Sequence, residues 1–237
     1  MGYVMENFYT HIKGSTKDQF PYPNENLLNI KLPARIALVG PSGCGKTTTL
    51  INLIKGIGIW QKIVILAKIK DEPLYKLLTD KIQAMEKKLK IQMLLVIDTV
   101  DDLPDPSDFD PKECNLVIFD DMLCESKKSL ARIEQYFIYG RKYGVTSCFL
   151  SQNYYGIPQK IRQNCNYFII KQISKPMDLT RLLKDCNLGD LSIEQLKHMY
   201  KWAVSQGDPL LAFFMIDTSP TVAKALRIRA NFAGIDH

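Results

Sequence analysis

The stretch Gly40-Pro-Ser-Gly-Cys-Gly-Lys-Thr47 decides the fold of this chain. It fits the pattern G-x-x-x-x-G-K-[ST] of phosphate-binding loops at every fixed position. Glycines let the backbone wrap tightly, so that successive N–H groups can point at phosphates. Lys46 brings a positive charge to the outer phosphates, and the Thr47 hydroxyl can hold Mg²⁺. We therefore expect a nucleotide site made of Gly40, Pro41, Ser42, Gly43, Cys44, Gly45, Lys46, Thr47 and Thr48.

The sequence on either side of this loop supports the same interpretation. The apolar segment Arg35–Val39 reads as a short strand, and residues 48–55 read as a helix. A helix that begins at the loop adds the partial positive charge of its N-terminus to the site. Strand, loop and helix thus follow one another in the order that a phosphate site requires.

Strand-like and helix-like segments alternate along the rest of the chain. This alternation predicts an α/β fold with a mostly parallel central sheet flanked by helices. We expect strands near 35–40, 62–68, 92–98, 115–119, 145–151, 166–171 and 210–216, and helices near 45–56, 72–89, 126–141, 178–185 and 192–204. We also expect an N-terminal arm at 1–34, the main domain at 35–217 and a C-terminal tail or docking arm at 218–237.

The amino-acid composition is typical of a globular domain. It restricts the classes of possible binding partner only slightly. The 237 residues carry a formal net charge of +6, which is compatible with a polyanionic partner but does not require one. The longest apolar run, at 210–216, is far shorter than a membrane span, and the N-terminus lacks the pattern of a signal peptide. The six cysteines show no C-x-x-C spacing, which argues against a zinc site and favours small core residues.

Two acids follow the apolar run 115–119, namely Asp120 and Asp121. A buried parallel strand delivers such side chains at its carboxyl end, where ligands of open α/β sheets bind. We expect Asp120 to hold Mg²⁺, directly or through water. Asp121 would then polarise an attacking water, a role more often given to glutamate in ATPases of this kind.

The next strand along the chain, at 145–151, ends before Gln152. A glutamine there can hydrogen-bond both the attacking water and the terminal phosphate, and so report whether that phosphate is present. Phosphoryl transfer also benefits from an arginine that spreads over the developing charge. Arg141, before this strand, and Arg162, after it, are the candidates, and Arg162 can equally be a surface ion pair.

Together these segments resemble the FtsK–HerA superfamily of DNA-pumping ATPases, and within it the genome-packaging ATPases of double-stranded DNA viruses. The resemblance covers roughly 33–215. Its most specific parts are the Asp120-Asp121 pair, the segment Gly140-Arg-Lys-Tyr-Gly-Val145, and Phe149-Leu-Ser-Gln-Asn-Tyr-Tyr155, in that order. Also similar are Lys62–Lys68 with Asp71-Glu-Pro-Leu-Tyr75, and residues 157–170.

This resemblance implies a RecA-like core that binds ATP and Mg²⁺, a homo-oligomeric ring and an arginine supplied across the subunit interface. It implies double-stranded DNA as the partner that ATP hydrolysis moves through the ring, and a capsid or portal component as a docking partner. It places the protein inside the host cell, in the cytoplasm or at the viral assembly site, or with the virion. It also implies catalytic roles for Lys46, Asp121, Gln152 and Arg141, with Thr47 and Asp120 at the metal. The chain lacks room for the extra domains of cellular members, which leaves the DNA-gripping element open.

Three other functions remain open from sequence alone. A nucleotide or small-molecule kinase would share the loop, but the acids followed by Gln152 favour an activated water, and we see no arginine-rich lid. A nucleotide-controlled switch is a second alternative; residues 174–178 do not match the Asn-Lys-x-Asp run of guanine-specific proteins, which favours ATP. A cellular HerA-like translocase or helicase partner is the third.

Overall fold

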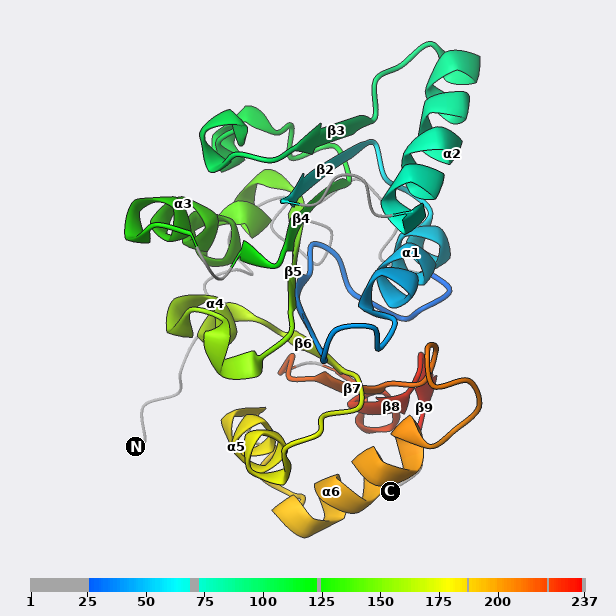
Figure 1. The fold of residues 1–237 in the computed structure, drawn as a ribbon, viewed down its shortest axis with the longest axis vertical. Helices are drawn as coiled ribbons and strands as arrows, with labels where there is room; N and C mark the ends of the chain where they lie inside the picture. Colours follow the sequence, from blue (N-terminus) through cyan, green and yellow to red (C-terminus); the bar gives the residue numbers. More distant parts are fainter. Residues whose placement is uncertain (1–25, 69–72, 123–124, 187, 221, 236–237) are drawn as a thin grey trace, which may run out of the picture.

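A computed structural model of the chain describes residues 26–68, 73–122, 125–186, 188–220 and 222–235. Strands in these residues form one sheet in the order β3-β2-β4-β5-β1-β6-β7-β8-β9 (Figure 1). The pairings from β3 through β6 are parallel, and those from β6 to β9 are antiparallel. The strands are β1 (Arg35–Val39), β2 (Lys62–Ala67), β3 (Leu94–Ile97), β4 (Asn115–Asp120), β5 (Val145–Ser151), β6 (Tyr167–Ile170), β7 (Phe214–Asp217), β8 (Ile228–Ala230) and β9 (Ala233–Gly234).

Helices cover both faces of this sheet (Figure 1). One face packs against α1 (Lys46–Ile57) and α2 (Pro73–Leu89), together with the segment 28–34 that precedes β1. The other face packs against α3 (Lys127–Ile138), α4 (Gln159–Asn164), α5 (Pro176–Cys186) and α6 (Ile193–Val204). Each helix presents an apolar stripe to the sheet, which is why the strands between the two layers are apolar on both sides.

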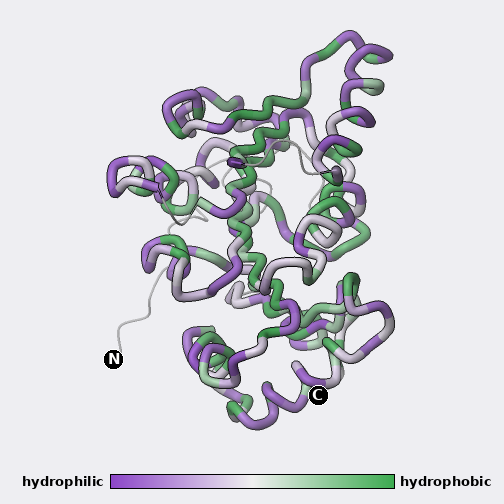
Figure 2. Tube along the Cα trace, viewed as in Figure 1, coloured by the Kyte–Doolittle hydropathy of each residue, from purple (hydrophilic) through white to green (hydrophobic). Residues whose placement is uncertain are grey.

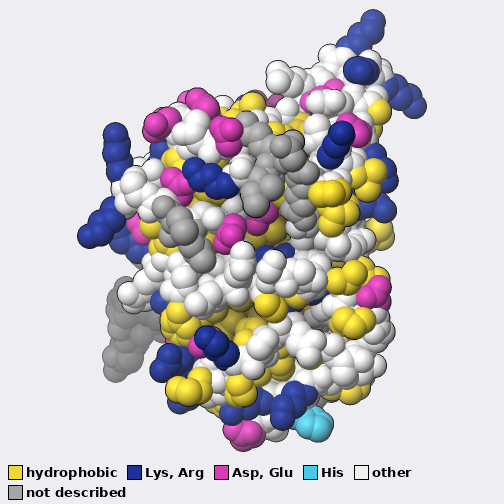
Figure 3. Space-filling view, in the orientation of Figure 1, with side chains coloured by type: hydrophobic (Ala, Val, Ile, Leu, Met, Phe, Trp, Pro, Cys, Tyr) yellow, Lys and Arg dark blue, Asp and Glu magenta, His cyan; other side chains and the backbone are white. Residues whose placement is uncertain are grey.

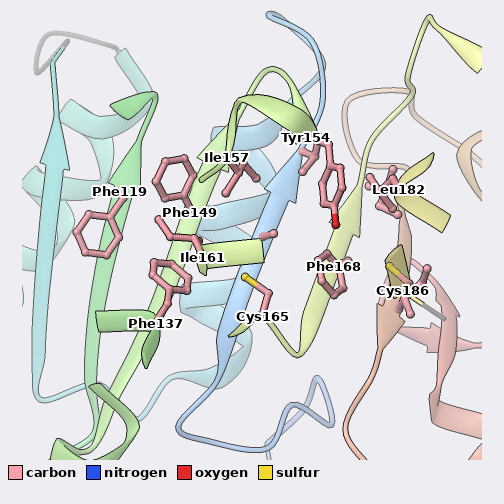
Figure 4. Packing of buried hydrophobic residues seen from close by; sticks show 14 of the residues in the cluster. Phe119, Phe137, Phe149, Tyr154, Ile157, Ile161, Cys165, Phe168, Leu182 and Cys186 are labelled. Carbon is pink, nitrogen blue, oxygen red and sulfur yellow. The ribbon is translucent and has the colours of Figure 1, made fainter. Parts of the chain in front are cut away.

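Figure 2 shows this layering as apolar strands at the centre and hydrophilic segments on the outer turns of the helices. Aromatic side chains fill the α3 side of the core. Phe119 of β4 and Phe149 of β5 stack with ring centroids 6.4 Å apart, and Phe137 of α3 lies within 6.3 Å of both (Figure 4). Such ring pairs contribute about 0.5–1.5 kcal/mol beyond their buried area. They fix β4 and β5, the two strands that carry the acids and Gln152.

The expected α/β fold with a mostly parallel sheet and flanking helices is confirmed. Several details differ from the expectation. The helix α4 was not expected, and the apolar run 210–216 is a strand only from Phe214 onward. The helix expected at 126–141 ends at Ile138 and continues as a separate 3₁₀ turn, Gly140–Tyr143.

The boundaries proposed for the main domain stay a prediction, but both flanking segments reach the core. Leu28, Ile30 and Leu32 are buried on the α1 side of the sheet. The strand β8 pairs with β7, although its sequence was expected to form a tail. The fully buried Arg229 of β8 joins the two segments, because its guanidinium donates to the carbonyls of Leu28 (2.7 Å) and Asn29 (3.1 Å).

Candidate nucleotide site

A cleft of about 580 Å³ lies where the parallel strands end, and we call it the phosphate cleft. Its size falls within the usual range for small-molecule sites. It contains most of the residues that the sequence nominated. Its lining is Ser42, Gly43, Gly45, Lys46, Thr47, Thr48, Ala67, Lys68, Leu74, Asp120, Asp121, Gln152 and Leu210.

The loop between β1 and α1 has the backbone that a phosphate site needs. Gly43 and Gly45 adopt the left-handed region, at φ +74° and +84°, where residues with a side chain are strained. Gly45 is also the N-cap residue of α1 and provides no side chain to cap it. The start of α1 therefore has no side-chain cap, and this helix end can receive an anion.

Lys46 lies across this loop. Its ammonium group donates hydrogen bonds to the carbonyl oxygens of Gly40 and Pro41, both at 2.9 Å. These two bonds hold the charge over the loop that the phosphates would occupy. Phosphate oxygens are stronger acceptors for an ammonium group than neutral carbonyls are, so the same lysine can turn to them.

The acids and the glutamine meet as the sequence suggested. Asp120 ends β4, and Gln152 follows β5, which pairs with β4 so that Asp120 lies beside Leu150. The side-chain amide of Gln152 donates to Oδ2 of Asp121 at 3.0 Å. Asp121 itself is exposed and has φ +54°, a left-handed conformation at the first residue after β4 ends. The roles assigned to these three residues stay predictions, whereas their juxtaposition is a feature of the fold.

Tyr75 contacts Asp120, a contact that no sequence pattern predicted. Its hydroxyl donates to Oδ2 of Asp120 at 2.7 Å, from the first turns of α2, and the residue is 3% exposed. The sequence separation of 45 residues hides this pair from any local pattern. A second unexpected pair is the ion pair of Lys68 with Glu125, at 2.6 Å, which places another cation at the phosphate cleft.

A buried lysine supports the loop from behind. Lys171, just after β6, has no exposed surface, and its ammonium group donates to the carbonyl of Leu210 (2.9 Å) and the hydroxyl of Thr49 (3.3 Å). Burial lowers the pKa of Lys171 from its ordinary value. A Cβ on Gly40 would lie 2.5 Å from that of Lys171, and one on Gly45 would lie 2.2 Å from the Leu210 carbonyl. Because both positions are glycine, Lys171 and Leu210 can lie directly against the loop.

The donors present fit a magnesium ion. Mg²⁺ in nucleotide sites usually takes one or two carboxylates or hydroxyls from the protein and the rest from phosphates and water. Thr47 and Asp120 line the same cleft and supply one hydroxyl and one carboxylate. The remaining positions would be left for the nucleotide and water.

Arg141 lies before the start of β5, at the end of the parallel strands opposite the phosphate cleft. It precedes β5 in the 3₁₀ turn Gly140–Tyr143, whereas the phosphate cleft lies beyond the other end of that strand. Burial lowers the pKa of Arg35, at the start of β1, and the nearby charge of Arg141 lowers it further. Seven strand residues, at about 3.3 Å each, separate Arg141 from the end that carries Gln152. Within one subunit, Arg141 and Lys46 therefore cannot share a phosphate.

Arg162, the other candidate, lies in α4 beside two aromatic rings. Its guanidinium carbon is 5.1 Å from the ring centroid of Tyr154 and 4.6 Å from that of Tyr155. Its Nε and Nη1 atoms are buried and have no hydrogen-bond partner among the described residues. It does not line the phosphate cleft.

A family model described as "Poxvirus A32 protein" matches residues 19–205. The chain belongs to this poxvirus A32 family. A search of curated proteins gives no match.

Solved structures support the fold of this A32 family member. The DNA-packaging ATPase B204 of Sulfolobus turreted icosahedral virus matches at a TM-score of 0.55 and 12% identity, over 83% of this chain and 96% of that one. The genome-packaging NTPase B204 of Sulfolobus turreted icosahedral virus 2, in complex with AMPPCP, matches at 0.53 and 13% over the same shares. Its complex with AMP matches at 0.52 and 15%, again over 83% and 96%. The resemblance to viral packaging ATPases that the sequence suggested is confirmed.

Proposed function

We propose that this protein is an ATP-hydrolysing translocase that packages viral double-stranded DNA into a capsid. The observation that carries the proposal is the cluster of Asp120, Asp121 and Gln152 facing Lys46 across one cleft. Family membership and the shared fold with the B204 packaging NTPases support the biological setting. The structures of B204 with AMPPCP and ATP-gammaS support ATP as the nucleotide here.

The residues of the cleft divide the chemistry among them. Lys46 and the N–H groups at the start of α1 bind the phosphates. Thr47 and Asp120 hold Mg²⁺, which when bound neutralises charge on the outer phosphates. Asp121 accepts a proton from the attacking water, and Gln152 orients that water through the amide group that also contacts Asp121.

The position of Arg141 supports a ring of identical subunits. An arginine at the edge of the sheet opposite the phosphate cleft is exposed and available to the cleft of a neighbouring subunit. Double-stranded DNA would be the polymer that such a ring moves, and a capsid or portal component its docking site. We place this activity at the viral assembly site or in the cytoplasm of the host cell. None of the described helices is long and apolar enough to cross a membrane.

Contacts with DNA should involve phosphates and be independent of sequence, because a packaging motor must accept any part of a genome. The distribution of surface charge is compatible with such sequence-independent contacts. Lys and Arg side chains are spread over the face shown in Figure 3 with Asp and Glu among them. We therefore expect DNA affinity to arise from cations of several subunits in a ring.

ATPase activity with and without double-stranded DNA, measured beside the oligomeric state, tests this function. We expect DNA to stimulate turnover in the ring, and the affinity for DNA to fall steeply with salt. Lys46→Ala should abolish hydrolysis and weaken ATP binding. Phosphorylation of a small acceptor without any response to DNA would support a kinase instead. A sharp preference for one short DNA sequence that persists at high salt would indicate a regulator.

A further inference from the structure

A second cavity, of about 490 Å³, lies beside α1. We call it the side cavity and define it by Leu28, Asn52, Leu211, Phe213, Asn231 and Phe232, which are among its lining residues. It shares none of its lining with the phosphate cleft. The two cavities nevertheless adjoin along the chain, because Thr48 and Leu210 line the phosphate cleft while Thr49 and Leu211 line the side cavity.

Strand register places the side cavity at the same edge of the sheet as the phosphate-binding loop. Val39 pairs with Ile170, Ile170 with Phe214, and Phe214 with Ala230, so these residues form one row across four strands. Gly40, Phe213 and Asn231 each lie one residue beyond that row, on the side where β1 enters the loop. The acids and Gln152 lie on the other side of β1, beyond β4 and β5. A nucleotide whose terminal phosphate faces the acids therefore extends its other end toward β7 and β8.

The lining of the side cavity suits a flat, mostly apolar ring that carries polar atoms on its edge. Phe213 and Phe232 form an edge-to-face pair with centroids 4.9 Å apart, and Leu28 and Leu211 add apolar surface. Asn52 uses its amide N–H on the Thr48 carbonyl, which leaves its Oδ1 as an acceptor. Asn231 uses Oδ1 to accept from the backbone of Phe213, which leaves its amide N–H as a donor. A purine has the complementary donors and acceptors on its edge.

The walls of this cavity are held in place by the interior. The fully buried Arg229 donates to the Leu28 carbonyl at 2.7 Å and so fixes the wall that precedes β1. Gly56 allows that wall to approach α1, since a Cβ there would lie 2.7 Å from Leu28. The cavity is therefore built into the fold before any ligand arrives, as is usual for small-molecule sites.

The geometry points to the side cavity as the binding site for the purine base of the nucleotide whose phosphates occupy Gly40–Thr48. This inference rests on the proposed function, because it requires a nucleoside triphosphate at the phosphate cleft. The base stacks on the Phe213–Phe232 wall, and the amides of Asn52 and Asn231 contact its edge. The ribose passes the Leu210–Leu211 segment, which the buried Lys171 holds against the loop.

The test separates the base from the phosphates by comparing ATP with inorganic tripolyphosphate. Asn52 is exposed on α1, so Asn52→Trp fills the side cavity without disturbing the core. Lys201→Trp, which places the same ring at an exposed position of α6, is the matched control. Phe232→Ala, which removes one aromatic wall, is the second variant. Dissociation constants of both ligands are measured by calorimetry with full-length protein in the presence of Mg²⁺.

We expect the wild-type chain and Lys201→Trp to bind ATP more tightly than tripolyphosphate. Stacking of a base on an aromatic ring accounts for a factor of about 5 to 150 in affinity. Asn52→Trp and Phe232→Ala should lose most of that factor for ATP and bind tripolyphosphate as the wild type does. Unchanged ATP affinity in both variants, or an equal loss for both ligands, would overturn the assignment of the base. Failure of the wild type to bind either ligand would instead overturn the proposed function.

Discussion

The side-chain amide of Gln152 donates a 3.0 Å hydrogen bond to Oδ2 of Asp121 across two neighbouring strands of the sheet. This contact joins the proposed proton acceptor to the residue that would sense the terminal phosphate. Gln152→Ala should therefore lower the rate of hydrolysis by about 10²–10³-fold, the cost of losing one positioned donor, with little change in ATP affinity. Single-turnover kinetics beside a binding titration checks this. Equal losses in affinity and rate would assign Gln152 to ground-state binding.

Asp121→Asn keeps the shape of the side chain and an oxygen that Gln152 can donate to, but removes the proton acceptor. We expect ATP binding to survive while turnover falls by about two to four orders of magnitude, the usual contribution of a general base. Asp120→Asn is the comparison, because it should weaken Mg²⁺-dependent binding. If Asp121→Asn destroyed that binding and Asp120→Asn left it intact, the two roles would be reversed.

Tyr75→Phe removes the hydroxyl that donates to Asp120 and keeps the buried ring. Groups that orient a metal ligand typically contribute about 10–100-fold in metal affinity or activity. We therefore expect a higher Mg²⁺ concentration for half-maximal ATPase activity, with near-normal turnover at saturating Mg²⁺. A variant with an unchanged Mg²⁺ requirement and lower turnover would show that Tyr75 acts on something other than the metal site. Tyr155→Phe, on the α4 side, is a suitable control.

Arg141→Ala should bind ATP normally and hydrolyse it poorly, because the arginine would serve the cleft of a neighbouring subunit. Mixing Arg141→Ala with Lys46→Ala tests this directly. Some interfaces then pair an intact loop on one subunit with an intact arginine on the other, so part of the activity should return. Mixed rings verified by native mass spectrometry that recover no activity would favour Arg162 or an arginine acting within its own subunit.

Arg229→Met should destabilise the whole domain. The guanidinium has no exposed surface, and it bonds the carbonyls of Leu28 and Asn29 and lies 3.6 Å from the buried carboxylate of Asp217. Removing one partner of a buried ion pair costs about 3–5 kcal/mol, which chemical denaturation can measure. Arg227→Met, which breaks a partly exposed pair with Asp190 and a hydrogen bond to the Leu188 carbonyl, should shift the midpoint far less. Similar shifts for the two variants would contradict a structural role for the buried arginine.

The features that short segments of sequence determine could be predicted from sequence patterns. The loop from Gly40 to Thr47, the strands beside it and the meeting of Asp121 with Gln152 all follow from short motifs at the carboxyl ends of apolar runs. Residues 210–213 were wrongly expected to belong to a strand because they are apolar. Leu210 instead lines the phosphate cleft, and Leu211 and Phe213 line the side cavity.

What could not be predicted depends on contacts between distant segments. Tyr75 meets Asp120 over 45 residues, and Lys171 meets Thr49 over 122. Arg229 bonds the Leu28 carbonyl over 201 residues. The strand β8 has only three residues, too few for an alternating pattern to stand out. Its pairing becomes apparent only once β7 provides an open edge.

One strand, β5, connects the region of Arg141 with the phosphate cleft. Arg141 precedes it and Gln152 follows it, with about 20 Å of hydrogen-bonded backbone between them. Because β5 pairs with β1 and β4 on its two sides, it cannot bend independently of the sheet. In a ring, a small tilt of β5 with its sheet at the Gln152 end, which senses the phosphate, would displace Arg141 at the other end. Hydrolysis in one subunit would then move the arginine that completes the cleft of the next subunit. The rigidity of β5 would therefore set the order in which the subunits of the ring hydrolyse ATP.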